Sequence, residues 1–407
     1  MATKDGLLPG RFFPRKIILW FLVWGNGNFV VTIGIYFHIP FCQAKCNYCH
    51  FVSLPFSART AEKYEKAVIR EMNSFAGSSP QRSAVDSIYF GGGTPTLVPA
   101  EQVAALLGSC RRLFSVLPEC EISLEANPGT LSPEKIGVFH RSGVNRVSLG
   151  AQSFNDHELL SIGRLHTADM ISKSISLLHL GGLTNMNLDL MLGIPGQTAD
   201  SWRRNLQEVR RLDVPHLSVY MLDLDEQCPL SSLVDSGKVR IPEEDLIADL
   251  YLETISFLSQ CGYVQYEISN FAKPGFACRH NLKYWQREPV CGFGLGSHSF
   301  DGGSRYSNLS QIDDYFDAIK AGKSAVSWRE PVASDRSLAE SLFLGLRLTC
   351  GVNWEMLQGI YGRENMKQYE SGMRALSERG LVEWKESTVR LTHSGMLLSN
   401  EVFQLFV

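Results

Sequence analysis

Three cysteines within eight residues of one another carry the clearest chemical signal in this sequence. Cys42, Cys46 and Cys49 form a C-x3-C-x2-C pattern on one short segment. Three close thiolates can ligate one metal centre, and a cluster held by three protein ligands keeps one iron open for a substrate or cofactor. A structural zinc ion normally takes four protein ligands, often as two pairs, and the remaining cysteines are scattered singly. The pattern therefore predicts a [4Fe–4S] cluster, and a zinc site with His50 as fourth ligand stays the alternative.

The cysteines follow the first of six strand-like runs that alternate with helical patterns. These runs span residues 34–38, 87–90, 122–125, 146–149, 186–191 and 217–221. Between them, residues 60–75, 101–114, 168–180 and 201–212 carry apolar side chains at three- and four-residue spacing, as helices packed on a sheet do. The order predicts an α/β fold built on a partial (β/α)6 barrel. In such a barrel the loops that follow the strands face the functional site.

We expect the chain to have three parts. Residues 1–31 hold an apolar run at 17–24 that is too short to cross a membrane as a helix, so they are expected to be a dispensable extension. A cleaved signal or a peripheral anchor stays the alternative for this part. Residues 32–304 would form the barrel and its extension, with a further helix over 243–260. Residues 305–407 would form a small α+β domain that resembles a winged helix, with helices over 338–348 and 364–378 and a hairpin of 380–384 with 389–392.

Composition and charge exclude several classes of protein. The 407 residues are 44% apolar, enough for a large core, so a disordered or fibrous chain is excluded. The net charge is −3, and the predicted hairpin carries only Lys385 and Arg390 as basic residues, so no nucleic-acid partner is expected. The ten cysteines are too sparse for a secreted disulfide scaffold, which indicates a reducing, cytoplasmic compartment.

Polar residues and glycines stand where the predicted strands end. Gly92, Gly93 and Thr94 follow the second strand, and glycines let the backbone approach a ligand closely. Glu125, Gln152 and Asp189 lie at or just beyond the ends of strands three, four and five; their side chains are expected to converge at the mouth of the barrel. One such residue alone would be a helix cap or a structural hydrogen bond. Three on successive strands predict a ligand site.

Six motifs then occur in an order typical of a known group of proteins. They are YFHIPFC at 36–42, GGGTPT at 91–96, EANP at 125–128, GAQSF at 150–154, DLMLGIPGQT at 189–198 and HNLKYW at 280–285. With its cysteine loop after the first strand, the chain resembles the radical S-adenosylmethionine (SAM) superfamily. Within it, the chain is similar to the family of oxygen-independent coproporphyrinogen III oxidases and HemW haem chaperones, from about Ile35 to its C-terminus.

The resemblance implies a set of cofactors and their binding residues. The cluster would be held by Cys42, Cys46 and Cys49, and it would deliver an electron that cleaves SAM to methionine and a 5′-deoxyadenosyl radical. The residues that the resemblance assigns to SAM are Tyr36, Gly92, Gly93, Thr94, Glu125, Gln152, Arg164 and Asp189. No protein side chain is assigned as catalytic, because the cofactor carries the difficult step.

The resemblance leaves an enzyme and a carrier to be distinguished. Oxidases of this family have a further cysteine two residues after the third, where this chain has Phe51, and a long N-terminal segment over the active site that residues 1–33 do not resemble. The chaperone branch is thought to bind haem through the segment that begins at His280; a structural histidine among aromatic residues is the alternative. We therefore expect a haem chaperone rather than the oxidase or a chemically inert scaffold. Its partners would be haem, an apo-haemoprotein acceptor and a reductant such as flavodoxin or ferredoxin, and a homodimer stays open.

Overall fold

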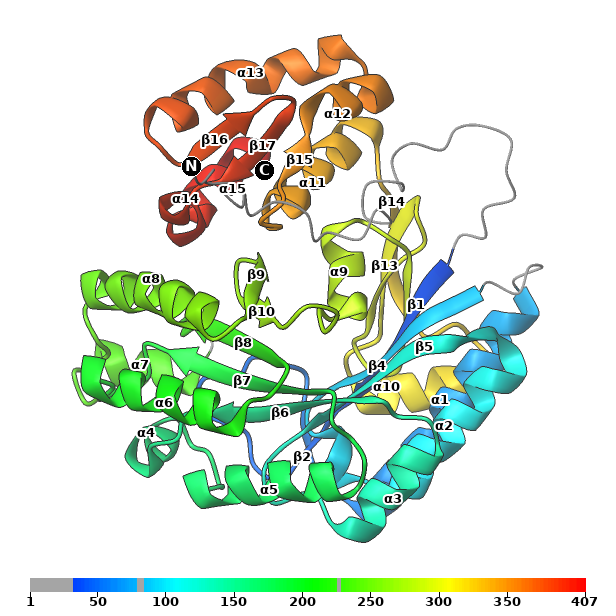
Figure 1. Cartoon of the computed structure of the whole chain (residues 1–407). Coiled ribbons are helices and arrows are strands. Elements are labelled where there is room, and N and C mark those ends of the chain that lie inside the picture. The colour runs from blue at the N-terminus through cyan, green and yellow to red at the C-terminus, as the bar shows by residue number, and fades with distance from the viewer. Residues whose placement is uncertain (1–31, 79–83, 225–227) are drawn as a thin grey trace, which may run out of the picture.

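A curved sheet of twelve strands forms the centre of the molecule (Figure 1). The structure, a computed structural model, describes residues 32–78, 84–224 and 228–407. The strands β1 (Thr32–Ile39), β4 (Ala84–Gly92), β5 (Ser115–Ala126), β6 (Arg146–Gln152), β7 (Met186–Leu192) and β8 (His216–Met221) are neighbours in this order and pair in parallel. They contain all six predicted strand runs, so the prediction of a six-unit α/β fold is confirmed.

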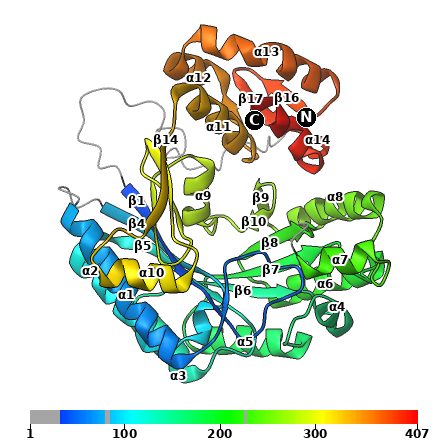
Figure 2. The same cartoon turned by 180° about the vertical axis from the view of Figure 1, so that it is seen from behind.

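Helices follow the strands and cover one side of the sheet (Figures 1 and 2). They are α1 (Ala58–Ser78), α2 (Ala100–Leu113), α3 (Pro133–Arg141), α4 (Asp156–Ser161), α5 (Ala168–Leu180), α6 (Ala199–Leu212), α7 (Pro229–Asp235) and α8 (Glu244–Gln260), with a short 3-10 helix at Pro95–Leu97. The helices α1, α2, α5, α6 and α8 match the predicted ranges within a few residues. The helices α3, α4 and α7 are not among the predicted ones.

The two faces of the central strands differ in polarity because successive side chains point to opposite faces. Outward residues such as Phe37, Phe90 and Leu124 are apolar and have no exposed surface, and they form the main core under the helices. Inward residues alternate with them and are mostly polar. They include Ser87 and Tyr89 on β4, Ser123 and Glu125 on β5, Arg146 and Ser148 on β6, Asn187 and Asp189 on β7, and Ser218 on β8. The interior of the curved sheet is therefore built for polar ligands rather than for dense apolar packing.

The large sheet continues beyond the six predicted units. β11 (Val290–Phe293) pairs in parallel with the free edge of β1, and β12 (His298–Phe300), β13 (Ser304–Asn308) and β14 (Val326–Pro331) follow as antiparallel strands. The strands β9 (Val264–Glu267) and β10 (Asn270–Ala272) close the other edge next to β8. The helices α9 (Arg279–Trp285) and α10 (Ile312–Lys320) belong to this extension. The division expected at residue 305 falls inside the β12–β13 pairing, so the large sheet ends at Pro331 and not at residue 304.

The C-terminal residues form a separate small sheet with its own helices. The strands β15 (Val352–Asn353), β16 (Val382–Lys385) and β17 (Thr388–Leu391) pair antiparallel, with α11 (Ser334–Leu346), α12 (Trp354–Tyr361), α13 (Arg363–Glu378), α14 (His393–Leu397) and α15 (Ser399–Phe403) around them and a 3-10 turn at Gln404–Phe406. The predicted helix-and-hairpin arrangement is confirmed. In Figure 1 this part lies above the sheet, and α9 stands between the two.

The predicted extension of residues 1–31 lies outside the described residues. Within the described ranges, no helix is both long and apolar enough to span a bilayer.

Candidate functional site

A cavity of about 440 Å³ occupies the inside of the curved sheet. It gathers all of the predicted site residues except Tyr36 and His280. Those that line it are Cys42, Cys46, Cys49, Gly92, Gly93, Thr94, Glu125, Gln152, Arg164 and Asp189. They come from loops and strand ends that span about 150 residues of sequence, and the parallel strands bring them together at their carboxyl ends.

The cysteine loop forms one end of this cavity. After β1 the chain makes the short strand β2 (Phe41–Cys42), which pairs with β3 (Leu54–Pro55), and the loop between them carries the thiols. All three cysteines are free and half-buried. Burial raises the pKa of the Cys42 and Cys49 thiols. Among the described residues, no group of three His, Cys, Asp or Glu side chains converges on a single metal ion.

The glycines beside the loop allow a close backbone approach. A Cβ atom on Gly93 would lie 2.7 Å from the carbonyl oxygen of Phe41 and 2.9 Å from Cys42 Sγ, so only glycine fits there. Gly92 has φ +114°, a conformation that side chains rarely adopt. The next residue, Thr94, donates its backbone N–H to Phe41 O over 2.8 Å and thereby fixes the glycine turn against the cysteine loop.

Two carboxylates face the cavity from neighbouring parts of the sheet. Glu125 accepts hydrogen bonds from Tyr89 Oη at 3.0 Å and from Gly92 N at 3.1 Å. Burial and the nearby Asp189 raise the pKa of Glu125 to about 7 despite these donors. Asp189 accepts from Ser148 Oγ at 3.1 Å and from Asn187 Nδ2 at 2.7 Å, and burial raises its pKa. Two carboxyl groups whose charges are costly when the site is empty are suited to a cationic ligand.

Arg164 and Gln152 complete this end of the cavity. Arg164 Nη2 donates to Asn127 Oδ1 and to Gly150 O, both at 2.6 Å, and Nη1 lies 3.7 Å from Cys46 Sγ. Arg164 therefore ties the cysteine loop to the ends of β5 and β6. Gln152 has φ 64°, and its side-chain Oε1 is buried with no hydrogen-bond partner in the described part of the chain. A strained, unpartnered amide at a cavity is typical of a group that a ligand satisfies.

These residues fit the cofactors of a radical SAM protein. The three half-buried thiols match the ligand set of a cluster with one open iron. The carboxyl groups of Glu125 and Asp189 match a ligand that carries an ammonium and a sulfonium, and the unpartnered Gln152 amide offers a further hydrogen bond. When bound, the cluster supplies the electron that breaks a C–S bond of SAM. The protein's own residues orient the ligands, and the glycine turn lets the backbone reach them.

The structure places His280 beside the cavity and not among its lining residues, and its role as a haem ligand stays a prediction. Only 1% of its surface is exposed. Its Nδ1 lies 3.0 Å from Ser87 Oγ and its Nε2 lies 3.1 Å from Tyr284 Oη, so both ring nitrogens already have partners. Burial lowers the pKa of His280 to about 3, which keeps the ring neutral. The ring also stacks on Tyr89 at 5.2 Å between centroids, so His280 supports the cavity wall from behind.

Tyr36 is likewise a neighbour of the cavity and not one of its lining residues. Its hydroxyl lies 3.2 Å from His38 Nδ1, and its ring stacks on Tyr89 at 6.2 Å. It thus belongs to the same aromatic wall as His280. A direct contact of Tyr36 with SAM stays a prediction.

Several residues that line the cavity are not among the predicted site residues. They are Tyr48, Tyr89, Asn127, Arg146, Ser148, Asn187, Ser218, Tyr220 and Asn281. Most occupy inward positions within strands, whereas the predicted residues lie at strand ends and in the loops that follow them. The signal was present, because polar residues alternate with apolar ones along β6 and β7 where a packed barrel would have apolar residues on both faces.

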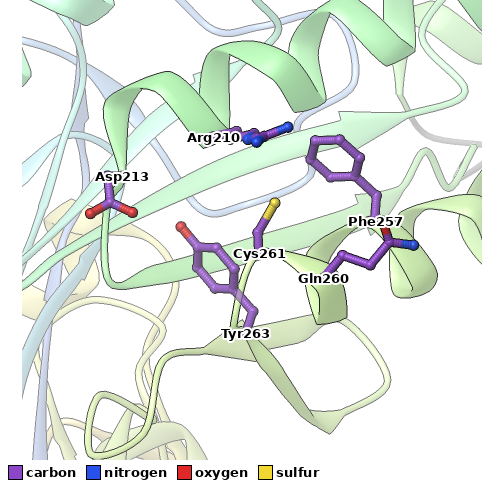
Figure 3. A pocket seen from close by; sticks show the side chains of 6 residues that line it. All are labelled: Arg210, Asp213, Phe257, Gln260, Cys261 and Tyr263. Atoms are coloured by element: carbon purple, nitrogen blue, oxygen red, sulfur yellow. The ribbon is translucent and has the colours of Figure 1, made fainter.

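A second cavity, of about 380 Å³, lies between the C-terminal ends of α6 and α8 (Figure 3). It is lined by Arg210, Asp213, Phe257, Gln260, Cys261 and Tyr263. The carboxylate of Asp213 is paired with Lys273 Nζ at 2.5 Å, and the Tyr263 hydroxyl donates to Val214 O. None of the predicted site residues lies here, so this cavity is separate from the cysteine loop.

Comparison with known proteins agrees with this geometry. The family model described as the Radical SAM superfamily matches residues 36–209, which include the cysteine loop and the residues predicted to bind SAM. The fold and site therefore define a radical SAM protein. The chain is 36% identical over 373 residues to "Heme chaperone HemW" of Bacillus subtilis (strain 168), which covers 91% of this chain and 98% of that protein. It is 35% identical to "Heme chaperone HemW" of Lactococcus lactis subsp. lactis (strain IL1403), over 91% of this chain and 96% of that protein. The chain belongs to this HemW family.

A solved structure shows the same fold. Coproporphyrinogen III oxidase (HemN) from Escherichia coli superimposes with a TM-score of 0.81 at 23% identity, over 97% of this chain and 93% of that one. The similarity thus covers the large sheet and the C-terminal part together.

Proposed function

We propose that this protein is a haem chaperone that binds haem and delivers it to apo-haemoproteins, with a [4Fe–4S] cluster on Cys42, Cys46 and Cys49 and with SAM beside it. The observation that carries the proposal is the 36% identity to a HemW haem chaperone over 98% of that protein's length. The cavity supports it with a thiol loop and a polar ligand chamber in one continuous space.

A second candidate function is the oxidative decarboxylation of coproporphyrinogen III, because the fold matches that of HemN. The residue at position 51 favours the chaperone. Oxidases of this family are expected to have a cysteine where this chain has Phe51, and Phe51 lines the cavity with 59% of its surface exposed. A large exposed aromatic side chain next to the cysteine loop suits contact with a flat apolar macrocycle better than electron transfer.

The proposed partners follow from this function. An apo-haemoprotein would accept haem, and a reductant protein such as flavodoxin or ferredoxin would supply the electron to the cluster. We place the protein in the cytoplasm, where free thiols stay reduced, and a homodimer stays open.

The proposal is tested by assaying both functions in one preparation. The full chain is reconstituted anaerobically with iron and sulfide and then titrated with haem, and transfer is followed to apomyoglobin as a model acceptor. The same sample is incubated with coproporphyrinogen III, SAM and reductant. We expect saturable haem binding, transfer, and no divinyl product. Turnover of coproporphyrinogen would overturn the chaperone assignment in favour of the oxidase, and failure to bind haem would overturn it outright.

A matched variant sharpens this assay. Phe51→Ala removes the exposed ring, and we expect it to weaken haem binding by roughly fivefold to tenfold while the cluster is retained. Trp384→Ala is the control, because Trp384 is likewise an exposed aromatic residue, with 41% of its surface exposed, but lies in the small C-terminal sheet.

A further inference from the structure

Arg146 is a buried cation that the function described so far does not use. Only 2% of its surface is exposed, yet it lines the main cavity. Its guanidinium makes no hydrogen bond or ion pair with any residue that the structure describes, and its Nε is buried without a partner. A buried arginine is normally paired, because an uncompensated charge in the interior is costly. Such a residue is held in place for a partner that comes from outside the chain.

The acidic groups whose charges act on Arg146 are Glu121 and Asp189, and both are already engaged elsewhere. Asp189 accepts from Ser148 Oγ and Asn187 Nδ2. Glu121 accepts the backbone N–H groups of Arg279 and His280, both at 3.0 Å, one on each carboxylate oxygen. Burial lowers the pKa of Arg146, but the neighbouring Cys278 and Glu121 raise it, and the net shift is upward. The guanidinium therefore stays charged at all physiological pH values.

Arg146 lies far from Gln152 on its strand, although its charge also acts on Asp189. Arg146 is the first residue of β6 and Gln152 is the last, so their Cα atoms lie at most about 20 Å apart along the strand at about 3.3 Å per residue. The cavity reaches from the cysteine loop at one end to Arg146 at the other. The inner end is closed by α9, whose Lys283 pairs with Asp86 on β4 at 2.9 Å.

Two further polar groups accompany Arg146 at this inner end. Asn281 from α9 also lines the cavity. Ser123, its register partner on β5, is fully buried, and its hydroxyl has no hydrogen-bond partner among the described residues. A guanidinium next to amide and hydroxyl donors is the combination that binds a carboxylate.

We propose that Arg146 and Asn281 form a carboxylate-binding subsite at the inner end of the cavity, where they anchor a carboxylate of a bound ligand. This assignment rests on the proposed function: the ligand is haem, and the carboxylate is one of its propionates. The carboxylate of SAM is the second source of the same chemistry, and the comparison of ligands below distinguishes the two.

The test compares ligands that differ only in the carboxylate. Reconstituted full-length protein and its Arg146→Met variant are titrated with haem, with haem dimethyl ester, with SAM and with decarboxylated SAM. We expect the variant to bind haem about tenfold to a hundredfold more weakly, as for the loss of a charged hydrogen bond, and to bind the ester and both SAM probes as the wild type does. A loss confined to SAM, with decarboxylated SAM unaffected, would support the subsite with SAM as the carboxylate source.

Two outcomes would overturn the proposal. One is unchanged binding of all four probes. The other is a parallel loss of all four together with a lower melting temperature, because that would make Arg146 a structural residue. If Arg146→Met does not fold, Arg146→Lys carries the test: a smaller preference for haem over its ester supports the subsite, and an unchanged preference overturns it.

A matched control is available in Arg287, a largely buried arginine outside the cavity. It pairs with Glu340 at 3.0 Å, so Arg287→Met should lower stability without changing the affinity for any probe. If the wild type binds neither haem nor its ester, the proposed function fails. The subsite at Arg146 is then still tested by comparing SAM with decarboxylated SAM.

Discussion

The cysteine loop and the α9 segment are both rich in groups that bind metals, but they differ in how those groups are used. On the loop, Cys42, Cys46 and Cys49 are half-buried free thiols that face the cavity. On α9, His280 is buried with both ring nitrogens hydrogen-bonded, and its neighbour Lys283 is paired with Asp86 and Glu288. Residue type alone therefore does not indicate which side chains are free to bind a metal. A side chain is free to do so when its donor atoms are not already hydrogen-bonded within the protein.

We expect the largest effect from substitutions in the cysteine loop. Replacing any one of Cys42, Cys46 or Cys49 by serine should remove the cluster, because three ligands hold it and the described residues offer no spare thiol at the cavity. Iron and acid-labile sulfide after anaerobic reconstitution should fall to background. Cys350→Ser is the control, because Cys350 is exposed and distant in the C-terminal part, and it should retain full iron. Full cluster content in all three loop variants would refute the assignment.

The loop side was predictable because its information is local. The C-x3-C-x2-C spacing and the six strand runs can be read from neighbouring residues, and the structure places them as expected. The extension of the sheet by β11 to β14 was missed, because these strands are short and pair with one another and with the far edge of β1.

The α9 side was not predictable because its chemistry depends on distant partners. Ser87, which occupies one ring nitrogen of His280, lies 193 positions away in the sequence. The inward position of Arg146 likewise depends on the pairing of β5 with β6, and its Nε is buried without a hydrogen-bond partner among the described residues. A pattern of residues close together in the sequence cannot predict contacts between such distant positions.

A second, intermediate effect tests the α9 side. His280→Ala removes a buried ring with two hydrogen bonds and an aromatic contact, so it should lower the free energy of unfolding by roughly 2–4 kcal/mol. We expect the haem affinity of the protein that remains folded to stay near the wild-type value, because both ring nitrogens are hydrogen-bonded within the protein. Chemical denaturation and haem titration measure the two quantities separately.

His298→Ala is the matched control for this variant. His298 is exposed on β12, so the change should alter stability by no more than about 0.5 kcal/mol. If the His280 variant keeps its stability but no longer binds haem, His280 is an iron ligand. The α9 segment would then bind metal as the cysteine loop is expected to do.

We expect the smallest effect from a change of pH, which alters the charge of Glu125 in the cavity. Burial and Asp189 raise the pKa of Glu125 to about 7, so in the free protein this carboxyl is half-protonated near neutrality. A cationic ligand binds the ionised form, and its affinity should therefore rise with pH up to that pKa and level off above it. SAM should bind roughly eightfold more tightly at about pH 7.5 than at about pH 6 if Glu125 alone governs the change.

The same shift fixes the sign of the stability change. Because the folded-state pKa of Glu125 lies above the unfolded value, the free energy of unfolding should decrease as pH rises from about 4.5 to about 7, by at most about 1.4 kcal/mol per pH unit from this group. Glu125→Gln should flatten the pH dependence of SAM affinity measured by calorimetry. Glu71→Gln is the control, since burial also raises the pKa of Glu71, but it lies outside the main cavity and is hydrogen-bonded to Asn308 and Tyr315. An unchanged pH profile in the Glu125 variant, or a flattened one in the Glu71 variant, would show that the cavity carboxylates do not contact the cationic ligand.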